Sequence, residues 1–183
     1  MRHFGKVEPG RIGLVNIGPL VNVIVKPMAG DAAEASETPE AELKMMIDTG
    51  AQTTVIDESI PRELNLRPIR YIPIIGVNGN PVQRPVYPMS VSILMADDQR
   101  QEAGITVTME MVGAPIVNQG QQHRGLLGRD FLSHFIFEYV GPNGTFELRP
   151  GKALARRLKT IAKSRPAPNK NAAKRKRKKQ RRK

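Results

Sequence analysis

Apolar and polar residues alternate over short stretches of this 183-residue chain. The clearest case follows Gly18-Pro19, where Val21, Val23 and Val25 occupy every second position. Successive side chains of a strand point to opposite faces, so this period predicts a strand. Further strands are expected over residues 44–47, 55–56, 86–94, 105–112, 136–139 and 145–148. Many short strands separated by Gly and Pro predict an all-β, barrel-like domain.

Two short helices and one loop are expected between these strands. Asp57 can cap a helix that continues to Leu64, and Asn65 and Pro68 then end it. Residues 129–135 are expected to form a single helical turn or a short helix. Residues 28–42, rich in Ala and Glu, are expected to form an exposed connecting loop or an extended hairpin tip.

Residues 72–82 predict a β-hairpin. Two apolar runs flank Gly76, Val77, Asn78 and Gly79, and an Asn-Gly pair between such runs is the strongest short hairpin signal in a sequence. A plain surface hairpin would look the same. The position of this hairpin between the two motifs described below favours a mobile cover, or flap, over a cleft.

Charge is divided unevenly along the chain. Residues 152–183 hold 16 of the 29 Lys and Arg residues and no acidic residue, although the formal net charge of the whole chain is +12. The remaining residues hold 13 basic and all 17 acidic residues, a net charge of −4. This asymmetry predicts a folded domain over residues 1–150 and a basic tail over residues 151–183.

The tail has three interpretations. Leu154, Leu158 and Ile161 lie on one face of a possible basic amphipathic helix over residues 152–163, and disorder is expected after Arg165-Pro166. Nucleic acid is the most natural partner for this charge density, because phosphate contacts release counterions. An anionic membrane surface or a simple solubilising arm would give the same pattern.

Composition excludes several classes of protein. The chain has no cysteine, which excludes a disulfide framework and a thiol nucleophile. His3, His123 and His134 lack metal-ligand spacing, so no metal or other cofactor is expected, and these side chains are interpreted as structural or solvent-facing. No run of 18 apolar residues and no targeting segment is present, and a soluble, cytoplasmic protein is expected.

Two motifs carry the candidate chemistry. In the first, the apolar residues Met45, Met46 and Ile47 lead into a turn formed by Asp48, Thr49, Gly50 and Ala51. The second, far downstream, comprises Leu126, Leu127, Gly128 and Arg129. Peptide hydrolysis without a metal or a covalent nucleophile needs a base and an acid, and two carboxyl groups that share a proton supply both. One such turn is half of a site.

With these two motifs, residues 10–150 resemble the retropepsin-like aspartic proteases, and the small bacterial members more closely than the viral enzymes. The resemblance implies a closed all-β barrel with a flap hairpin and one short helix, and no cofactor. It implies that Asp48 is catalytic, that Thr49 locks two subunits together beneath the paired aspartates, and that the carbonyl of Gly50 contacts substrate. A homodimer that binds a peptide or protein substrate follows, because the chain is too short for two lobes and has one such motif.

The chain departs from the viral pattern at Gln52. The viral enzymes place an acid there, paired to the arginine that corresponds to Arg129. We therefore expect Arg129 to find a C-terminal carbonyl or another acid, or to form a structural ion pair with Asp130 beside it.

Two functions remain open at this stage. The first is a dimeric aspartic endopeptidase. The second is a binding or assembly module of the same fold, with weak or lost catalysis, anchored to nucleic acid by its tail. The intact Asp-Thr-Gly sequence favours the first, and Gln52 keeps the second open.

Overall fold

The computed structural model describes residues 6–7, 10–28, 39–76, 79–95, 103–116 and 122–156. The chain divides into two units, Met1–Pro150 and Gly151–Lys183. In the second unit, residues 152–156 form a helical turn, and the Ala155 N–H donates to the Gly151 carbonyl over 2.9 Å. The rest of the helix predicted over residues 152–163, and the disorder expected beyond it, lie outside the described residues.

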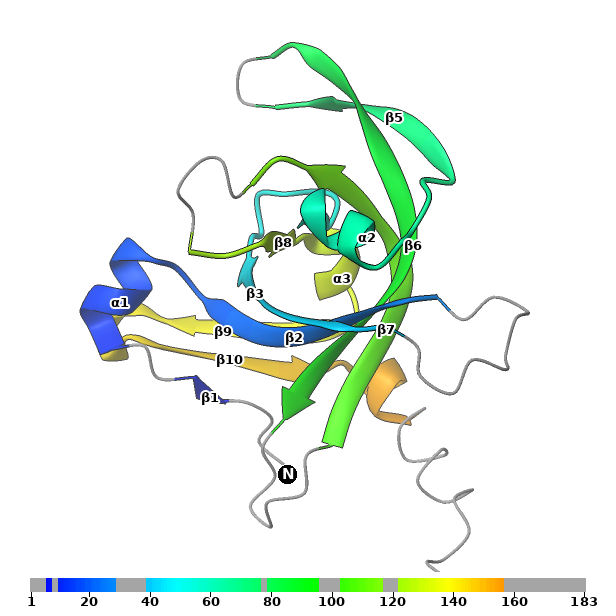
Figure 1. The fold of residues 1–183 in the computed structure, drawn as a ribbon. Helices are drawn as coiled ribbons and strands as arrows, with labels where there is room; N and C mark the ends of the chain where they lie inside the picture. The colour runs from blue at the N-terminus through cyan, green and yellow to red at the C-terminus, as the bar shows by residue number, and fades with distance from the viewer. Residues whose placement is uncertain are drawn as a thin grey trace, which may run out of the picture. The chain divides into compact units, whose positions relative to one another are not determined.

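Six strands of the first unit close into a β-barrel, which confirms the predicted fold class (Figure 1). The ring closes because its longest strand, Pro81–Met95, pairs with Ala103–Ala114 along one edge and with Leu20–Pro27 along the other. In order, the ring contains β2 (Leu20–Pro27), β3 (Ala41–Ile47), β8 (Gly125–Leu127), β4 (Val55–Asp57), β7 (Ala103–Ala114) and β6 (Pro81–Met95), which returns to β2.

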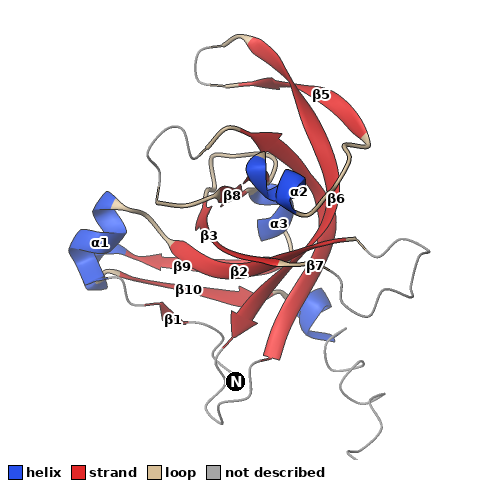
Figure 2. Ribbon diagram, in the orientation of Figure 1, coloured by secondary structure: helices blue, strands red, loops and turns tan. Residues whose placement is uncertain are grey.

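The predicted hairpin extends from this barrel. β5 (Arg70–Ile75) pairs with β6 alone, with Ile75 opposite Pro81. The two strands project beyond the ring (Figure 2). At the turn, Gly79 has φ of +73°, a left-handed conformation that glycine adopts without strain, and its N–H donates to the Gly76 carbonyl over 3.0 Å. Val77 and Asn78 lie outside the described residues.

A separate three-stranded sheet is built from both ends of the first unit. Its strand order is β1 (Lys6–Val7), β10 (Thr145–Pro150), β9 (Phe135–Val140), all antiparallel. The 3₁₀ turn η2 (Gly141–Asn143) joins β9 to β10, and Gly144 follows it at φ of +63°. The turn lies between the two strands predicted over residues 136–139 and 145–148.

The described part of the chain has more helix than the resemblance implied. Both predicted short helices are present, as α2 (Ser59–Glu63) and α3 (Arg129–Leu132). A further helix, α1 (Gly10–Asn16), contacts the η2 turn and buries Leu14. It was not expected, because Gly10 and Gly13 lower the intrinsic helix propensity of this stretch.

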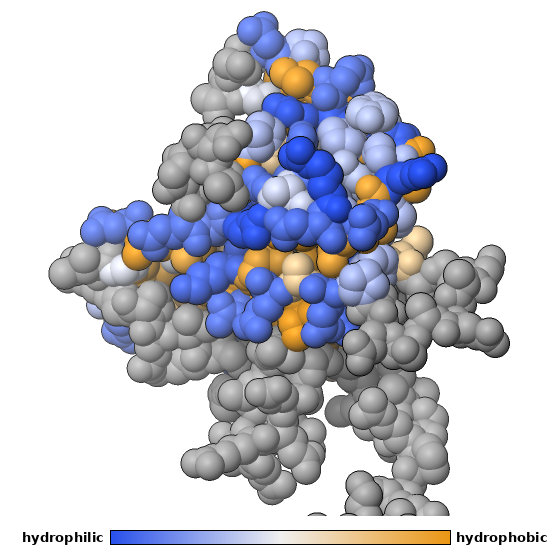
Figure 3. Space-filling model, in the orientation of Figure 1, coloured by the Kyte–Doolittle hydropathy of each residue, from blue (hydrophilic) through white to orange (hydrophobic). Residues whose placement is uncertain are grey.

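The alternating pattern identifies the core correctly. Val23 and Val25 of β2 and Met45 of β3 are fully buried, while the side chains between them are less buried or exposed. On the face drawn in Figure 3, hydrophilic residues predominate and apolar residues appear as separate patches. Burial of one face of each strand supplies the main driving force for closing the ring.

Candidate active site

The Asp48 turn connects two strands that flank a third. β3 ends at Ile47 and β4 begins at Val55. Between them lies β8, which leads into the second motif, Leu126 to Arg129, called the framing motif from here on. Leu126 of β8 is opposite Met46 in a parallel pair and opposite Val55 in an antiparallel pair. The two sequence motifs are thus joined by backbone hydrogen bonds, and the Asp48 N–H itself donates to the Leu127 carbonyl over 3.0 Å.

Local backbone donors orient the Asp48 carboxylate. Its Oδ1 accepts the N–H of Gly50 over 2.8 Å and the N–H of Ala51 over 3.2 Å. A Cβ on Gly50 would stand 3.1 Å from the same oxygen, closer than is usual for such contacts, so glycine suits this position. Asp48 is half-buried, whereas Thr49 and Gly50 are exposed. The turn therefore presents a fixed carboxylate at the surface of one chain.

Arg129 has a different partner from those expected. Its Nη1 donates to the Thr49 carbonyl over 3.0 Å and to the Gly50 carbonyl over 3.1 Å, and both acceptors belong to the turn. These main-chain carbonyls take the place of the acidic partner that was expected, whereas the C-terminal end of the chain lies outside the described residues. Without an acid at position 52, the guanidinium still finds two main-chain acceptors, and these two bonds tie α3 to the turn.

Asp130 forms a hydrogen-bond network with Thr54 instead of pairing with its neighbour. Its two carboxylate oxygens accept the Thr54 N–H over 2.8 Å and the Thr54 hydroxyl over 2.6 Å. The same hydroxyl accepts the Gly128 N–H over 3.1 Å. Thr54 is fully buried, so these bonds fasten the end of the turn to the framing motif. The only sequence signal for this role was that Asp130 adjoins that motif.

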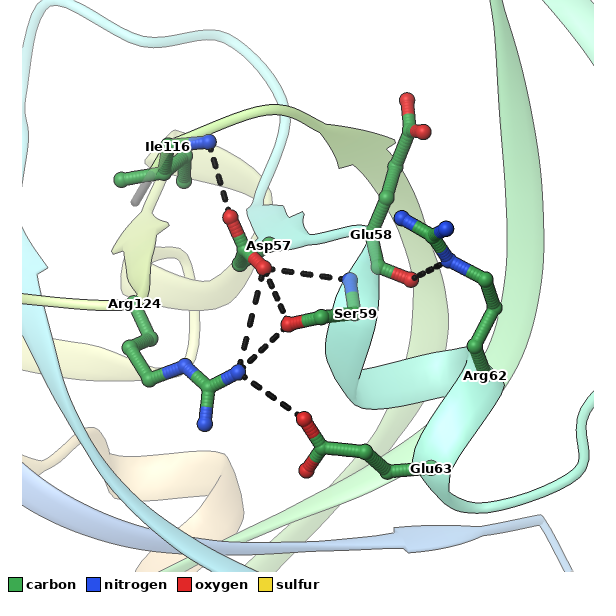
Figure 4. Close-up of polar contacts among 7 residues, drawn as sticks. All are labelled: Asp57, Glu58, Ser59, Arg62, Glu63, Ile116 and Arg124. Atoms are coloured by element: carbon green, nitrogen blue, oxygen red, sulfur yellow. Dashed lines mark hydrogen bonds and ion pairs between the residues drawn. The ribbon is translucent and has the colours of Figure 1, made fainter. Parts of the chain in front are cut away.

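A second polar network surrounds Asp57, as Figure 4 shows. This carboxylate, 5% exposed, accepts the N–H of Ser59 over 3.1 Å, the Ser59 hydroxyl, and the N–H of Ile116 over 2.9 Å. The Arg124 guanidinium donates to the Ser59 hydroxyl and forms ion pairs with the carboxylates of Glu63 and Asp57. The N-cap position of α2 is Glu58 and not Asp57 as predicted, although Asp57 still satisfies a first-turn N–H. The network ties β4 to the end of β7 and to the residue before β8.

His123 precedes this arginine and is buried, with 5% of its surface exposed. Its Nδ1 atom has no hydrogen-bond partner. Burial lowers the pKa of the His123 imidazole from its ordinary value of 6.5, against the opposing effects of the Gly125 carbonyl and the negative charge of Asp48. Of the two interpretations of His123, structural or solvent-facing, the structure supports the first. The side chain is buried, and its lowered pKa favours the neutral form.

Because the folded state of this histidine resists protonation, stability should depend on pH. Below about pH 6.5 the unfolded chain binds a proton that the folded chain does not, so the free energy of unfolding should fall as pH decreases from there. We expect His123→Gln to reduce this dependence, measured by urea unfolding between pH 5 and pH 8. The exposed His134, changed to Gln, is the matched control and should leave the slope as in the wild type.

No group of three or more His, Cys, Asp or Glu side chains suited to a metal ion occurs among the described residues. No helix in this part of the chain is long and apolar enough to cross a membrane.

Comparison with known proteins identifies the family to which the chain is similar. A family model described as aspartyl protease matches residues 37–131, which is more than half of the chain and includes both motifs. No curated protein matches the chain. Among solved structures, the chain is similar to a protease of simian foamy virus, with 18% identity, a TM-score of 0.38, and coverage of 63% of this chain and 92% of the viral one.

Proposed function

Because the chain belongs to the aspartyl protease family, we propose that it is an aspartic endopeptidase whose active form is a homodimer. The single observation that supports this best is the Asp48 turn: a carboxylate oriented by two N–H groups stands at the surface, on a turn held by Arg129. The Asp-Thr-Gly sequence occurs once in the chain. A second copy supplies the second carboxylate.

The proposed reaction uses the two Asp48 side chains as a unit. Two carboxylates held close together share one proton, because both cannot remain ionised at that distance. The ionised member removes a proton from water as the water attacks the peptide carbonyl. The protonated member donates its proton to the carbonyl oxygen, which gives a neutral gem-diol. As the C–N bond breaks, the member that took the proton from water passes it to the leaving nitrogen, and the other member takes a proton back from a diol hydroxyl as the new carboxyl group forms. Activity should therefore follow a bell-shaped dependence on pH.

We assign the β5–β6 hairpin as the flap over the substrate. It projects from the barrel, and Ile75 and Val82 near its end are 69% and 43% exposed, so they are available to contact an apolar ligand (Figure 1). An extended peptide binds such a surface by main-chain hydrogen bonds, with alternate side chains in pockets. The substrate class is thus an extended segment of a peptide or protein.

Dilution tests the dimeric mechanism. If each chain brings one half of the site, activity per chain should fall once the protein concentration drops below the dimer dissociation constant. The measurement is cleavage of a peptide library from mildly acidic to neutral pH, over a thousandfold range of protein concentration. A statine inhibitor, which imitates the tetrahedral transition state, should block cleavage.

A rate per chain that does not change with dilution would contradict the dimeric site. Complete absence of cleavage, together with retained peptide binding, would favour the alternative of a binding module that has lost catalysis.

A further inference from the structure

The Asp48 turn depends on β8, which is a very short strand. β8 and its neighbour β4 have three residues each, and two residue pairs join them, Val55 with Leu126 and Ile56 with Gly125. The Leu127 carbonyl of β8 accepts the Asp48 N–H over 3.0 Å, so a movement of β8 also moves the turn. Because strands this short have few main-chain bonds, the side chains at their ends matter for their position.

The end of β8 is fixed by Thr54, the residue before β4. The Thr54 hydroxyl accepts the Gly128 N–H and donates to the Asp130 carboxylate. The start of β8 needs a corresponding anchor. Asp57 is placed to supply it, because β4 and β8 are antiparallel and the Asp57 N–H donates to the carbonyl of Arg124, the residue before β8.

The Asp57 carboxylate holds the chain on both sides of β4 (Figure 4). Its Oδ2 accepts the N–H of Ile116, just beyond the end of β7, over 2.9 Å. Its Oδ1 accepts the Ser59 hydroxyl, and that hydroxyl accepts a hydrogen bond from the Arg124 guanidinium. The Arg124 Nη2 lies 3.9 Å from the same Oδ1. One carboxylate thus fixes the exit from β7 and the entry to β8.

The burial of Asp57 bears on the purpose of this arrangement. The residue is 5% exposed, and burying a carboxylate has a desolvation cost that its hydrogen bonds and ion pairs offset but seldom exceed. A buried carboxylate of this kind is therefore a poor source of net stability. What its directional bonds do supply is a fixed geometry for the segments that they join.

We propose that Asp57 is a positioning residue for peptide hydrolysis. Through Ser59 and Arg124 it holds the start of β8, so that the Leu127 carbonyl keeps the Asp48 turn in its reactive position. This inference rests on the proposed function, and it assigns Asp57 no part in the proton transfers. A displacement of about 1 Å at a reacting group can lower the rate about a hundredfold, so a positioning residue can have a large effect.

The first test breaks the link at its two outer members. Ser59→Ala and Arg124→Met leave the Ile116 N–H bonded to the buried carboxylate, so both variants should fold. We expect kcat per active site to fall about tenfold or more, with KM nearly unchanged, because Asp48 is displaced while the substrate-binding hairpin is not. Titration with a tight statine inhibitor counts the active sites. A merely structural role would reduce their number and leave kcat per site unchanged.

Two matched controls lie on the barrel away from β8. Ser92→Ala removes a hydroxyl that is 2.8 Å from the Thr106 hydroxyl. Lys26→Met removes an ion pair with Glu40, and the Lys26 side chain is 41% exposed, against 37% for Arg124. Both variants should keep the wild-type kcat per site.

Asp57→Asn should give a larger fall in kcat per site than either outer variant, because it removes the charge at the centre of the link. The double variant Asp57→Asn, Ser59→Ala should lose less than the product of the two single effects, since both changes act through the same bond. If Asp57→Asn fails to fold, the Ser59 and Arg124 variants decide.

The second test does not depend on activity. Amide hydrogen exchange of the full chain, followed by NMR, reports how often the bond from the Asp48 N–H to the Leu127 carbonyl opens. We expect this amide to exchange about tenfold faster in Ser59→Ala and Arg124→Met than in the wild type. The Met28 amide, which is bonded to the Pro88 carbonyl, is the internal reference and should not change.

The outcomes separate this inference from the proposed function. Unchanged kcat per site, unchanged exchange at Asp48, or equal effects in the two controls would overturn the positioning role and leave the protease standing. A wild-type chain that cleaves no peptide would overturn the proposed function, and the exchange rates alone would then decide whether the Asp57 link holds the Asp48 turn.

Discussion

Replacing Asp48 with asparagine should reduce peptide hydrolysis by at least about a thousandfold, the range that positioned acid–base groups contribute. The fold should survive. The carboxylate Oδ1 accepts two N–H groups, from Gly50 and Ala51, and the carbonyl oxygen of an asparagine side chain can accept the same two. What the amide cannot do is remove a proton from water or carry the shared proton.

The measurement is the initial rate of peptide cleavage beside an unfolding curve in urea for the same variant. Glu42→Gln is a matched control, because Glu42 is an exposed acid on the same strand, β3, and should leave both quantities unchanged. Undiminished cleavage by the Asp48 variant would remove the residue from the mechanism. Equal loss of cleavage and of stability would show only that the turn had collapsed.

The second large effect is expected at Gly128. A Cβ at this position would stand 2.6 Å from the Thr53 carbonyl carbon, 2.7 Å from its oxygen and 2.9 Å from the Thr54 nitrogen, all of them main-chain atoms. Backbone atoms held by the Asp130 network cannot move aside as a flexible side chain can. We expect Gly128→Ala to lower the free energy of unfolding by about 1–3 kcal/mol, the usual range for overpacking.

Urea unfolding at neutral pH measures this change. Gly141→Ala is the control, because its Cβ would meet only the ring of Tyr139, at 3.2 Å, and that ring is half exposed and can shift. We also expect the Gly128 variant to lose activity beyond its loss of stability, since the displaced atoms support the catalytic turn. Similar stability of the two alanine variants would show that the framing motif is looser than its contacts suggest.

The elements that depend on neighbours in sequence could be predicted without a structure. The Asp48 turn, the hairpin at Gly76–Gly79 and the alternating strand β2 each arise from a few adjacent residues, whose backbone preferences and periodicity are local properties. Fold class followed from the same signals, because many short strands with turn residues between them can bury their apolar faces in few ways.

The partners of the charged side chains were decided by the tertiary structure alone. Arg129 contacts carbonyls 79 and 80 residues away, and Asp130 contacts Thr54 from 76 residues away. Short-range patterns carry no information about such distances, so the sequence suggested a neighbouring acid for Arg129. Burial of His123 has the same origin, since no pattern in the residues adjacent to it indicates that its side chain is buried.

The sequence by itself determined that one carboxylate would stand on a tight turn after an apolar strand, because that requires only local residues. The tertiary structure decided that β8 pairs with both β3 and β4, and that β9 pairs with β10 alone among the strands of the described residues. Both depend on which strands become neighbours, and that choice is made by the packing of the whole domain, where apolar faces distant in sequence are buried against one another.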